Sequence, residues 1–146
     1  TDFAITGEAM ATNLYGWIRS MEENGLFSED VRVIAFTSEG SRKVLPGYGA
    51  VAAAKASLEA IVRQIAVEFA PRGIRANCIQ AGVTDTDSLR MIPESNKILE
   101  ASLVRNPFQR LTLPKDVANA VYLLCLPEAS WITGNILKVD GGESLR

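Results

Sequence analysis

Two side chains that could perform acid–base chemistry stand close together in this sequence. Tyr48 and Lys55 lie seven positions apart in the stretch YGAVAAAK, with only small apolar residues between them. At about 100° per residue, seven steps make almost two helical turns, so both side chains would share one helical face. A nearby ammonium group favours the phenolate form of a tyrosine. The pair could therefore assist proton donation, or it could belong to an ordinary amphipathic helix.

The composition narrows the chemistry that the chain can perform. Its 146 residues include no histidine, which excludes the Ser-His-Asp triad, the Cys-His dyad and histidine zinc sites. Acid–base work would fall to tyrosine, lysine, hydroxyl or carboxylate groups. The net charge of −2 predicts no nucleic-acid partner. Cys78 and Cys125 lie in apolar stretches without metal-site spacing, which predicts buried free thiols and no metal site.

The elements that would position the pair alternate between helices and strands. Apolar spacing predicts helices at 8–24, 49–70 and 114–126, and one or two short helices within 85–103. Short β-branched runs predict strands at 31–38, 74–82 and 135–142. This alternation is typical of βαβ units and a parallel sheet, hence of an α/β fold. No apolar run approaches the ~18 residues of a membrane span, and the first ten residues lack signal-peptide features.

Two long stretches resemble a known family. YGAVAAAKASLEAIVRQIAVEFAPRGIRANCIQAGVTDT resembles the second half of a short-chain dehydrogenase/reductase, and LPKDVANAVYLLCLPEASWITGNILKVDGG resembles its closing segment. Most members place the tyrosine and lysine four apart, whereas seven is similar to the enoyl-[acyl-carrier-protein] reductase branch. The stretch AGVTDTDSLRMIP is also similar to that branch. The resemblance implies the C-terminal half of a Rossmann-like doubly wound parallel sheet, with residues 1–146 forming half of one domain.

The resemblance also implies roles for individual side chains. Tyr48 would hydrogen-bond the substrate's thioester carbonyl and stabilise the enolate, and Lys55 would hold the hydroxyl groups of the nicotinamide ribose. Ser38, at the end of the first strand, matches the position of a second active-site side chain that contacts substrate. Thr37 beside it is a competing candidate. Alternatively, Ser38 could have a purely structural role, in which its hydroxyl hydrogen-bonds the loop that follows the strand.

The turn after the second strand and the segment beyond it complete the implied site. Residues of the turn would bind NADPH or NADH, with backbone groups on the nicotinamide carboxamide and a hydroxyl near the pyrophosphate: Gly82, Val83, Thr84 and Thr86. The segment 88–103 would form a substrate-binding lid. Its apolar lining would comprise Met91, Ile92, Ile98 and Leu99, although a helix stripe that packs on the core is an equal interpretation.

Parts of the family pattern are missing. The chain has no Gly-rich phosphate loop, so we expect a missing N-terminal half or partner chain, and expect these residues alone to bind cofactor poorly and to be inactive. The complete protein would act on an acyl-carrier-protein thioester, form a homo-oligomer (dimer or tetramer) through helices 8–24 and 49–70, and reside in the cytoplasm or a plastid. Two alternatives stay open: another short-chain NAD(P)-dependent carbonyl reductase, and a non-catalytic oligomerisation module.

Overall fold

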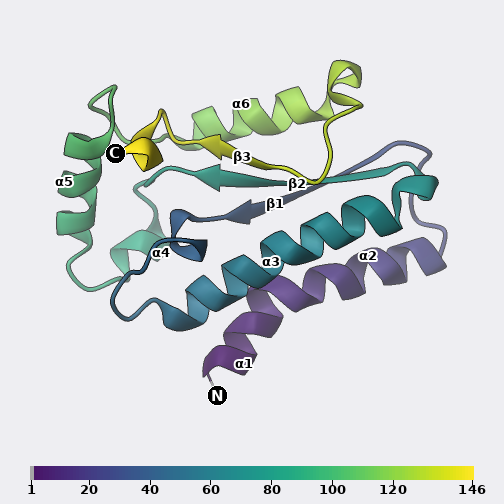
Figure 1. Ribbon diagram of the computed structural model, residues 1–146, viewed down its shortest axis with the longest axis horizontal. Coiled ribbons are helices and arrows are strands. Elements are labelled where there is room, and N and C mark those ends of the chain that lie inside the picture. The colour runs from purple at the N-terminus through teal and green to yellow at the C-terminus, as the bar shows by residue number, and fades with distance from the viewer. Residues whose placement is uncertain (1) are drawn as a thin grey trace.

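A parallel sheet of three strands forms the centre of the protein. The computed structural model describes residues 2–146, and Figure 1 shows the strands β1 (Val31–Thr37), β2 (Ile74–Ala81) and β3 (Ile136–Val139) side by side. Their order is β1-β2-β3, with Val31 opposite Ile74 and Cys78 opposite Ile136. The predicted α/β class and parallel sheet are therefore confirmed. The third strand is shorter than predicted, because Asp140 and the two glycines after it form a turn.

Helices cover both faces of this sheet. On one face lie α1 (Asp2–Gly7), a π-helical turn (Glu8–Thr12), α2 (Asn13–Glu23) and α3 (Gly49–Glu68), and α6 (Pro114–Cys125) lies on the other (Figure 1). Two short helices, α4 (Asp87–Arg90) and α5 (Ser95–Arg105), stand beyond the carboxyl ends of the strands. This end of a parallel sheet is where open α/β proteins bind ligands. The predicted short helices within 85–103 are thus present, and they lie where they can enclose a site.

The core fixes α3 against the sheet. Val62 and Ile65 of α3 and Ile74 of β2 are almost completely buried and belong to one apolar cluster, which α2 joins through Ile18. The ring of Tyr15 on α2 meets that of Phe69 edge-on at 5.9 Å, and its hydroxyl donates a 2.6 Å hydrogen bond to Glu68. Burial of this apolar surface is the main stabilising contribution. It holds α3 rigid, and α3 carries Lys55 and begins directly after Tyr48.

No helix within residues 2–146 combines the length and the apolar character that crossing a bilayer requires. The same residues contain no group of three or more His, Cys, Asp or Glu side chains placed to hold a metal ion.

The two cysteines differ in environment, contrary to the prediction that both are buried. Cys78 is buried in β2, whereas Cys125 is exposed at the end of α6, because Leu124 and not Cys125 turns toward the sheet. Burial raises the pKa of the Cys78 thiol to about 11, and the charge of Glu59 adds to this effect. Thiolate is the reactive form, so the two thiols should differ strongly in reactivity.

We expect iodoacetamide at pH 8 to alkylate Cys125 at least about 100-fold faster than Cys78 in the folded chain. Mass spectrometry of peptides from timed samples measures both rates. In urea both thiols should react at similar rates, which serves as the control. Equal rates in the folded chain would contradict the burial of Cys78.

Candidate active site

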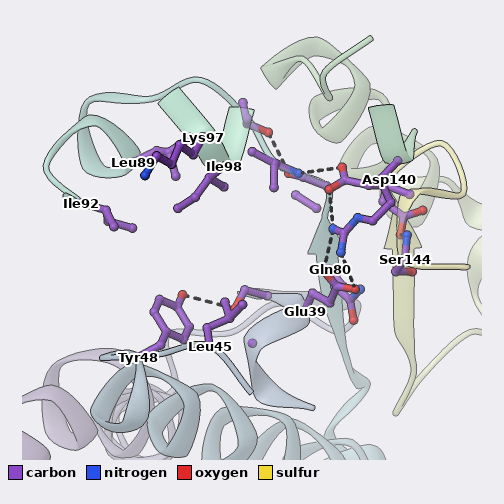
Figure 2. Close-up of a pocket in the computed structure, with 18 of the residues that line it drawn as sticks. Glu39, Leu45, Tyr48, Gln80, Leu89, Ile92, Lys97, Ile98, Asp140 and Ser144 are labelled. Carbon is purple, nitrogen blue, oxygen red and sulfur yellow. Dashed lines mark hydrogen bonds and ion pairs between the residues drawn. The ribbon is translucent and has the colours of Figure 1, made fainter. Parts of the chain in front are cut away.

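A cavity of about 450 Å³ opens at the carboxyl ends of β1 and β2. Figure 2 shows Leu45 and Tyr48 on one side of it and Leu89, Ile92 and Ile98 on the opposite side. Polar side chains close a third side; of those labelled in Figure 2 they are Glu39, Gln80, Asp140 and Ser144. Apolar walls with a few polar groups at one end are typical of small-molecule sites.

Two hydroxyl groups meet at the cavity wall. The Ser38 Oγ and the Tyr48 Oη lie 3.4 Å apart, and both residues line the cavity. The hydroxyl of Thr37 instead donates a 2.8 Å hydrogen bond to the buried carboxylate of Glu59, and Thr37 is only 6% exposed. Between the two neighbouring candidates, Ser38 is therefore the one placed to contact a ligand.

Tyr48 lies at the start of α3 and not within it. Its φ of −96° and ψ of 7° are not helical, and the residue is the N-cap. The helix therefore carries Lys55 but only begins at Tyr48, so the predicted pair on one helical face holds in part. The ring of Tyr48 packs against Gly40, where a Cβ atom would lie 2.4 Å from the ring carbon Cε1. The absence of a side chain at position 40 thus sets the orientation of the ring.

We expect Gly40→Ala to displace the Tyr48 ring, because a Cβ atom at position 40 would overlap the ring carbon Cε1. If the Tyr48 hydroxyl contacts substrate, this displacement should lower kcat of the full-length protein by about 10–100-fold, the loss that small misplacements of catalytic groups carry. Steady-state kinetics of the variant, beside its circular dichroism spectrum, measures the effect. Gly7→Ala is the matched control, because a Cβ atom at position 7 meets nothing within 4 Å. Gly47→Ala is unsuitable, because the φ of +74° at Gly47 would strain an alanine. An unchanged kcat in Gly40→Ala would contradict this role of Gly40.

Lys55 is half-buried and joins α3 to the end of β1. Its Nζ donates a 2.8 Å hydrogen bond to the backbone carbonyl of Phe36, two residues before Ser38. Burial lowers the pKa of Lys55 below its ordinary value. Lys55 is not among the residues that line the cavity.

The turn after β2 lines the cavity through Gly82, Val83 and Thr84. Both backbone groups of Val83 are engaged, because its N–H donates to Glu143 at 3.1 Å and its C=O accepts from the Thr112 N–H at 3.2 Å. By contrast, the backbone N–H and C=O of Thr84 form no hydrogen bond within residues 2–146. Val83 and Thr84 were both predicted to hydrogen-bond the nicotinamide carboxamide. Of the two, only Thr84 has a backbone N–H and C=O that form no other hydrogen bond within residues 2–146.

The remaining predicted residues lie at different distances from the cavity. The Thr86 hydroxyl caps α4 by accepting a 3.2 Å hydrogen bond from the Leu89 N–H, and Thr86 does not line the cavity. Ile92 and Ile98 line it, but Leu99 does not. Met91 is 84% exposed and also lies outside the lining. The predicted apolar lining is thus divided between residues that face the cavity and residues that face solvent.

An ion-pair cluster at the polar end of the cavity was missed by the sequence reasoning. Arg105 of α5 contacts Glu39 at 2.7 Å and Glu143 at 2.6 Å, and all three residues line the cavity. Burial lowers the pKa of Arg105, but hydrogen bonds to Glu143 and Glu39 outweigh burial and raise it above the ordinary value. Glu39 lies just after the carboxyl end of β1, and Glu143 lies after the Gly-Gly turn that follows β3. Because ligands bind at these strand ends, their positions could have identified both glutamates as candidates.

The chain therefore has a Rossmann-like arrangement, with a parallel sheet, helices on both faces and a cavity at the carboxyl ends of the strands. The family described as enoyl-(acyl carrier protein) reductase matches residues 2–144. A solved enoyl-[acyl-carrier-protein] reductase (NADH) from Aquifex aeolicus superposes with a TM-score of 0.79 and 31% identity, over 90% of this chain and 52% of that one. The chain belongs to the short-chain dehydrogenase/reductase superfamily, in its enoyl-acyl-carrier-protein reductase branch.

Curated relatives carry several activities in their names. A peroxisomal 2,4-dienoyl-CoA reductase of Saccharomyces cerevisiae is 41% identical over 67% of this chain and 34% of its own length. An enoyl-[acyl-carrier-protein] reductase [NADH] of Rickettsia bellii is 36% identical over 85% and 47%. A 7alpha-hydroxysteroid dehydrogenase of Escherichia coli is 36% identical over 84% and 46%. The chain thus spans between a third and a half of the length of these relatives.

Related structures have been solved with cofactor. The Bacillus cereus enoyl-acyl carrier protein reductase, solved with NADP+, superposes with a TM-score of 0.79 and 31% identity over 84% of this chain and 48% of that one. Together with the NADH named for the Rickettsia bellii relative, it shows that family members use either nicotinamide cofactor. The cavity described above is consistent with a nicotinamide ring: apolar walls, two hydroxyl groups 3.4 Å apart, and the unbonded amide group of Thr84.

Proposed function

We propose that this chain is the C-terminal part of an NAD(P)H-dependent oxidoreductase that reduces the enoyl double bond of an acyl-carrier-protein thioester in fatty acid synthesis. The observation that carries the proposal is the approach of the Ser38 and Tyr48 hydroxyl groups to 3.4 Å at the wall of an apolar cavity. The spacing of Tyr48 and Lys55 by seven residues supports the enoyl branch over the carbonyl-reducing branches.

Tyr48 would stabilise the charge that develops on the substrate. When bound, a reduced nicotinamide supplies a hydride to the β-carbon of the enoyl thioester. The thioester oxygen then gains negative charge, and the Tyr48 hydroxyl would donate a hydrogen bond to it. Ser38, beside Tyr48, would orient the same group. A proton from solvent would then reach the α-carbon, which restores the thioester carbonyl and completes the saturated product. The apolar side chains of Leu89, Ile92 and Ile98 would exclude water from the acyl chain.

Four further residues would hold the cofactor. A primary carboxamide carries one acceptor and two donors, which the free backbone N–H and C=O of Thr84 complement. Lys55 would contact the ribose hydroxyls of the bound cofactor. Gly82 would let the turn pack closely on Asp140 and Glu143 and so place its backbone beside the ring. The Thr86 hydroxyl would face the pyrophosphate.

An N-terminal half would supply the rest of the cofactor site. Within residues 2–146, β1 has a neighbouring strand on one side only, and Phe36 of β1 is 49% exposed. An apolar strand edge of this kind is normally paired or covered. We therefore propose that a further parallel strand pairs with β1, on this or another chain, and we call the assembled form the complete protein. The 146-residue chain alone should bind neither NADH nor NADPH tightly.

Substrate choice tests the proposal directly. The complete protein is incubated with NADH or NADPH and either a crotonyl or an acetoacetyl thioester, and the loss of absorbance at the nicotinamide band is followed. Consumption of the crotonyl thioester is the expected result. Consumption of the acetoacetyl thioester alone would assign the protein to carbonyl reduction, the second candidate, which the similarity to a 7alpha-hydroxysteroid dehydrogenase favours.

A non-catalytic oligomerisation module is the third candidate. Apolar side chains on α1, α2 and α3 remain exposed, with Phe3 at 60%, Trp17 at 66% and Val67 at 78%. A second copy of the chain could cover them. Sedimentation of the chain, with and without cofactor, distinguishes this candidate: stable oligomers without turnover by the complete protein would support it.

A further inference from the structure

We propose that Arg105 is a positioning residue, which fixes the cavity wall formed by α5 and, through Glu143, the turn after β2 at Val83. The Arg105 side chain bonds Glu39 and Glu143 and touches neither the Ser38 nor the Tyr48 hydroxyl. It acts on the site through two carboxylates. The kinetic part of the test below rests on the proposed function, whereas the exchange measurement does not.

Arg105 bridges two segments that are distant in sequence. Its Nη2 donates to the Glu143 Oε1 at 2.6 Å and to the Glu39 Oε2 at 2.7 Å, and its Nη1 reaches the other Glu39 oxygen at 3.4 Å. The side chain is 22% exposed, so solvent screens these pairs only in part. One guanidinium group thus joins α5 to the segment after β1 and to the turn after β3.

The buried carboxylate of Glu143 depends on Arg105 as its cationic partner. The side chain of Glu143 is 2% exposed, and a carboxylate buried to that extent requires a cationic partner or several hydrogen bonds. Arg105 is the cation paired with it within residues 2–146. The remaining Glu143 oxygen, Oε2, accepts the Val83 N–H at 3.1 Å. Removal of Arg105 would therefore disturb Glu143 and, with it, the backbone of the turn.

A second hydrogen bond, made by Asn106, connects the C-terminal end of α5 to the segment after β3. Asn106, directly after Arg105, donates a 3.0 Å hydrogen bond to the Asp140 carbonyl beyond β3. At the opposite end of α5, Lys97 pairs with Glu94, and both side chains are about 70% exposed. The helix is therefore held at its last turn and borders the cavity with its first turns, where Ile98 lies. Release of the last turn would shift that wall.

Amide hydrogen exchange on the 146-residue chain tests the positioning role. In Arg105→Gln we expect exchange at Val83 and within 95–105 to rise at least 10-fold, while β2 residues 74–79 change little. Arg110→Gln is the matched control, because Arg110 also forms an arginine–carboxylate pair, with Asp116 at 2.6 Å, but does not line this cavity. Equal exchange in the two variants would overturn the proposal.

Kinetics of the complete protein separate positioning from general loss of stability. Arg105→Gln should raise KM for the crotonyl thioester at least 10-fold with kcat changed less than 3-fold, and Arg105→Lys, which can still meet one carboxylate, should recover part of the loss. If kcat and KM worsen together and Arg105→Lys recovers nothing, the positioning role is wrong. If wild type reduces no thioester, the proposed function fails and the exchange result still decides the role of Arg105.

A milder variant covers the case in which Arg105→Gln does not fold. Glu39→Gln keeps the pair between Arg105 and the buried Glu143 and weakens only the tie to the segment after β1. We expect exchange within 95–105 to rise about 3-fold and exchange at Val83 to stay unchanged. No change within 95–105 would contradict a bridge through Glu39.

Discussion

Tyr48→Phe is expected to lower kcat for crotonyl thioester reduction by about 10³-fold, the loss typical of removing one donor to a developing oxyanion. The phenyl ring keeps its packing against Gly40, so the structure of the chain should not change. Affinity for NADH or NADPH should change much less than kcat, because the proposal assigns the cofactor contacts to Lys55 and Thr84 and the Tyr48 hydroxyl to the substrate. Single-turnover kinetics with saturating cofactor measures the chemical step.

Tyr122→Phe is the matched control for this loss. Tyr122 lies on α6, on the other face of the sheet, and is 66% exposed. Its replacement should leave kcat unchanged. If Tyr48→Phe retained more than a tenth of wild-type kcat, the hydrogen bond to the thioester carbonyl would have to come from another group, and Ser38→Ala would then be the next variant to measure.

Gly82→Ala is expected to destabilise the 146-residue chain by about 2–3 kcal/mol, the loss typical of an overpacked position. A Cβ atom at position 82 would lie 2.3 Å from the Thr112 Oγ1, 2.9 Å from the Glu143 Oε2 and 3.0 Å from the Asp140 Cα. Side chains can rotate away, but the backbone of Asp140 cannot do so without moving β3. Urea unfolding followed by circular dichroism measures the loss.

The control for Gly82→Ala is the same substitution in open space. Gly16 lies inside α2, and a Cβ atom there meets nothing within 4 Å. Because alanine is the better helix former, Gly16→Ala should stabilise the chain by about 0.5–1 kcal/mol. A Gly82→Ala chain as stable as wild type would mean that the turn after β2 tolerates movement, and it would also weaken the inference about Glu143 and Val83.

Most of the fold could be predicted because each strand and long helix is encoded locally. The β-branched run 31–37 and the apolar spacing of 49–68 carry their own signals, and their alternation favours parallel pairing. Details at the helix ends were less predictable. The helix after Tyr48 begins at Gly49 as predicted, but Tyr48, which was expected to share a helical face with Lys55, is its N-cap. Cys125 was expected to be buried but follows the last residue of α6 that packs on the sheet.

Only those residues of the candidate site that lie within short, recognisable stretches of sequence were predicted. Ser38 and Tyr48 were identified through the resemblance of the stretches around them to the short-chain reductase family, and their hydroxyl groups lie 3.4 Å apart in the structure. Their roles stay proposals. Arg105 could not be found in this way, since its partners Glu39 and Glu143 lie 66 and 38 positions away and no local pattern announces such a pair.

Those same separations bear on the order in which the protein folds. Closing a loop between distant residues costs chain entropy before any contact repays it, so contacts of long sequence separation form late. The bonds from Glu39 to Arg105 and from Val83 to Glu143 span 66 and 60 positions. The pairing of β1, α3 and β2 can precede them. We therefore expect a stage of folding in which β1, α3 and β2 are in place while β3 is not yet paired and the mouth of the cavity is still open.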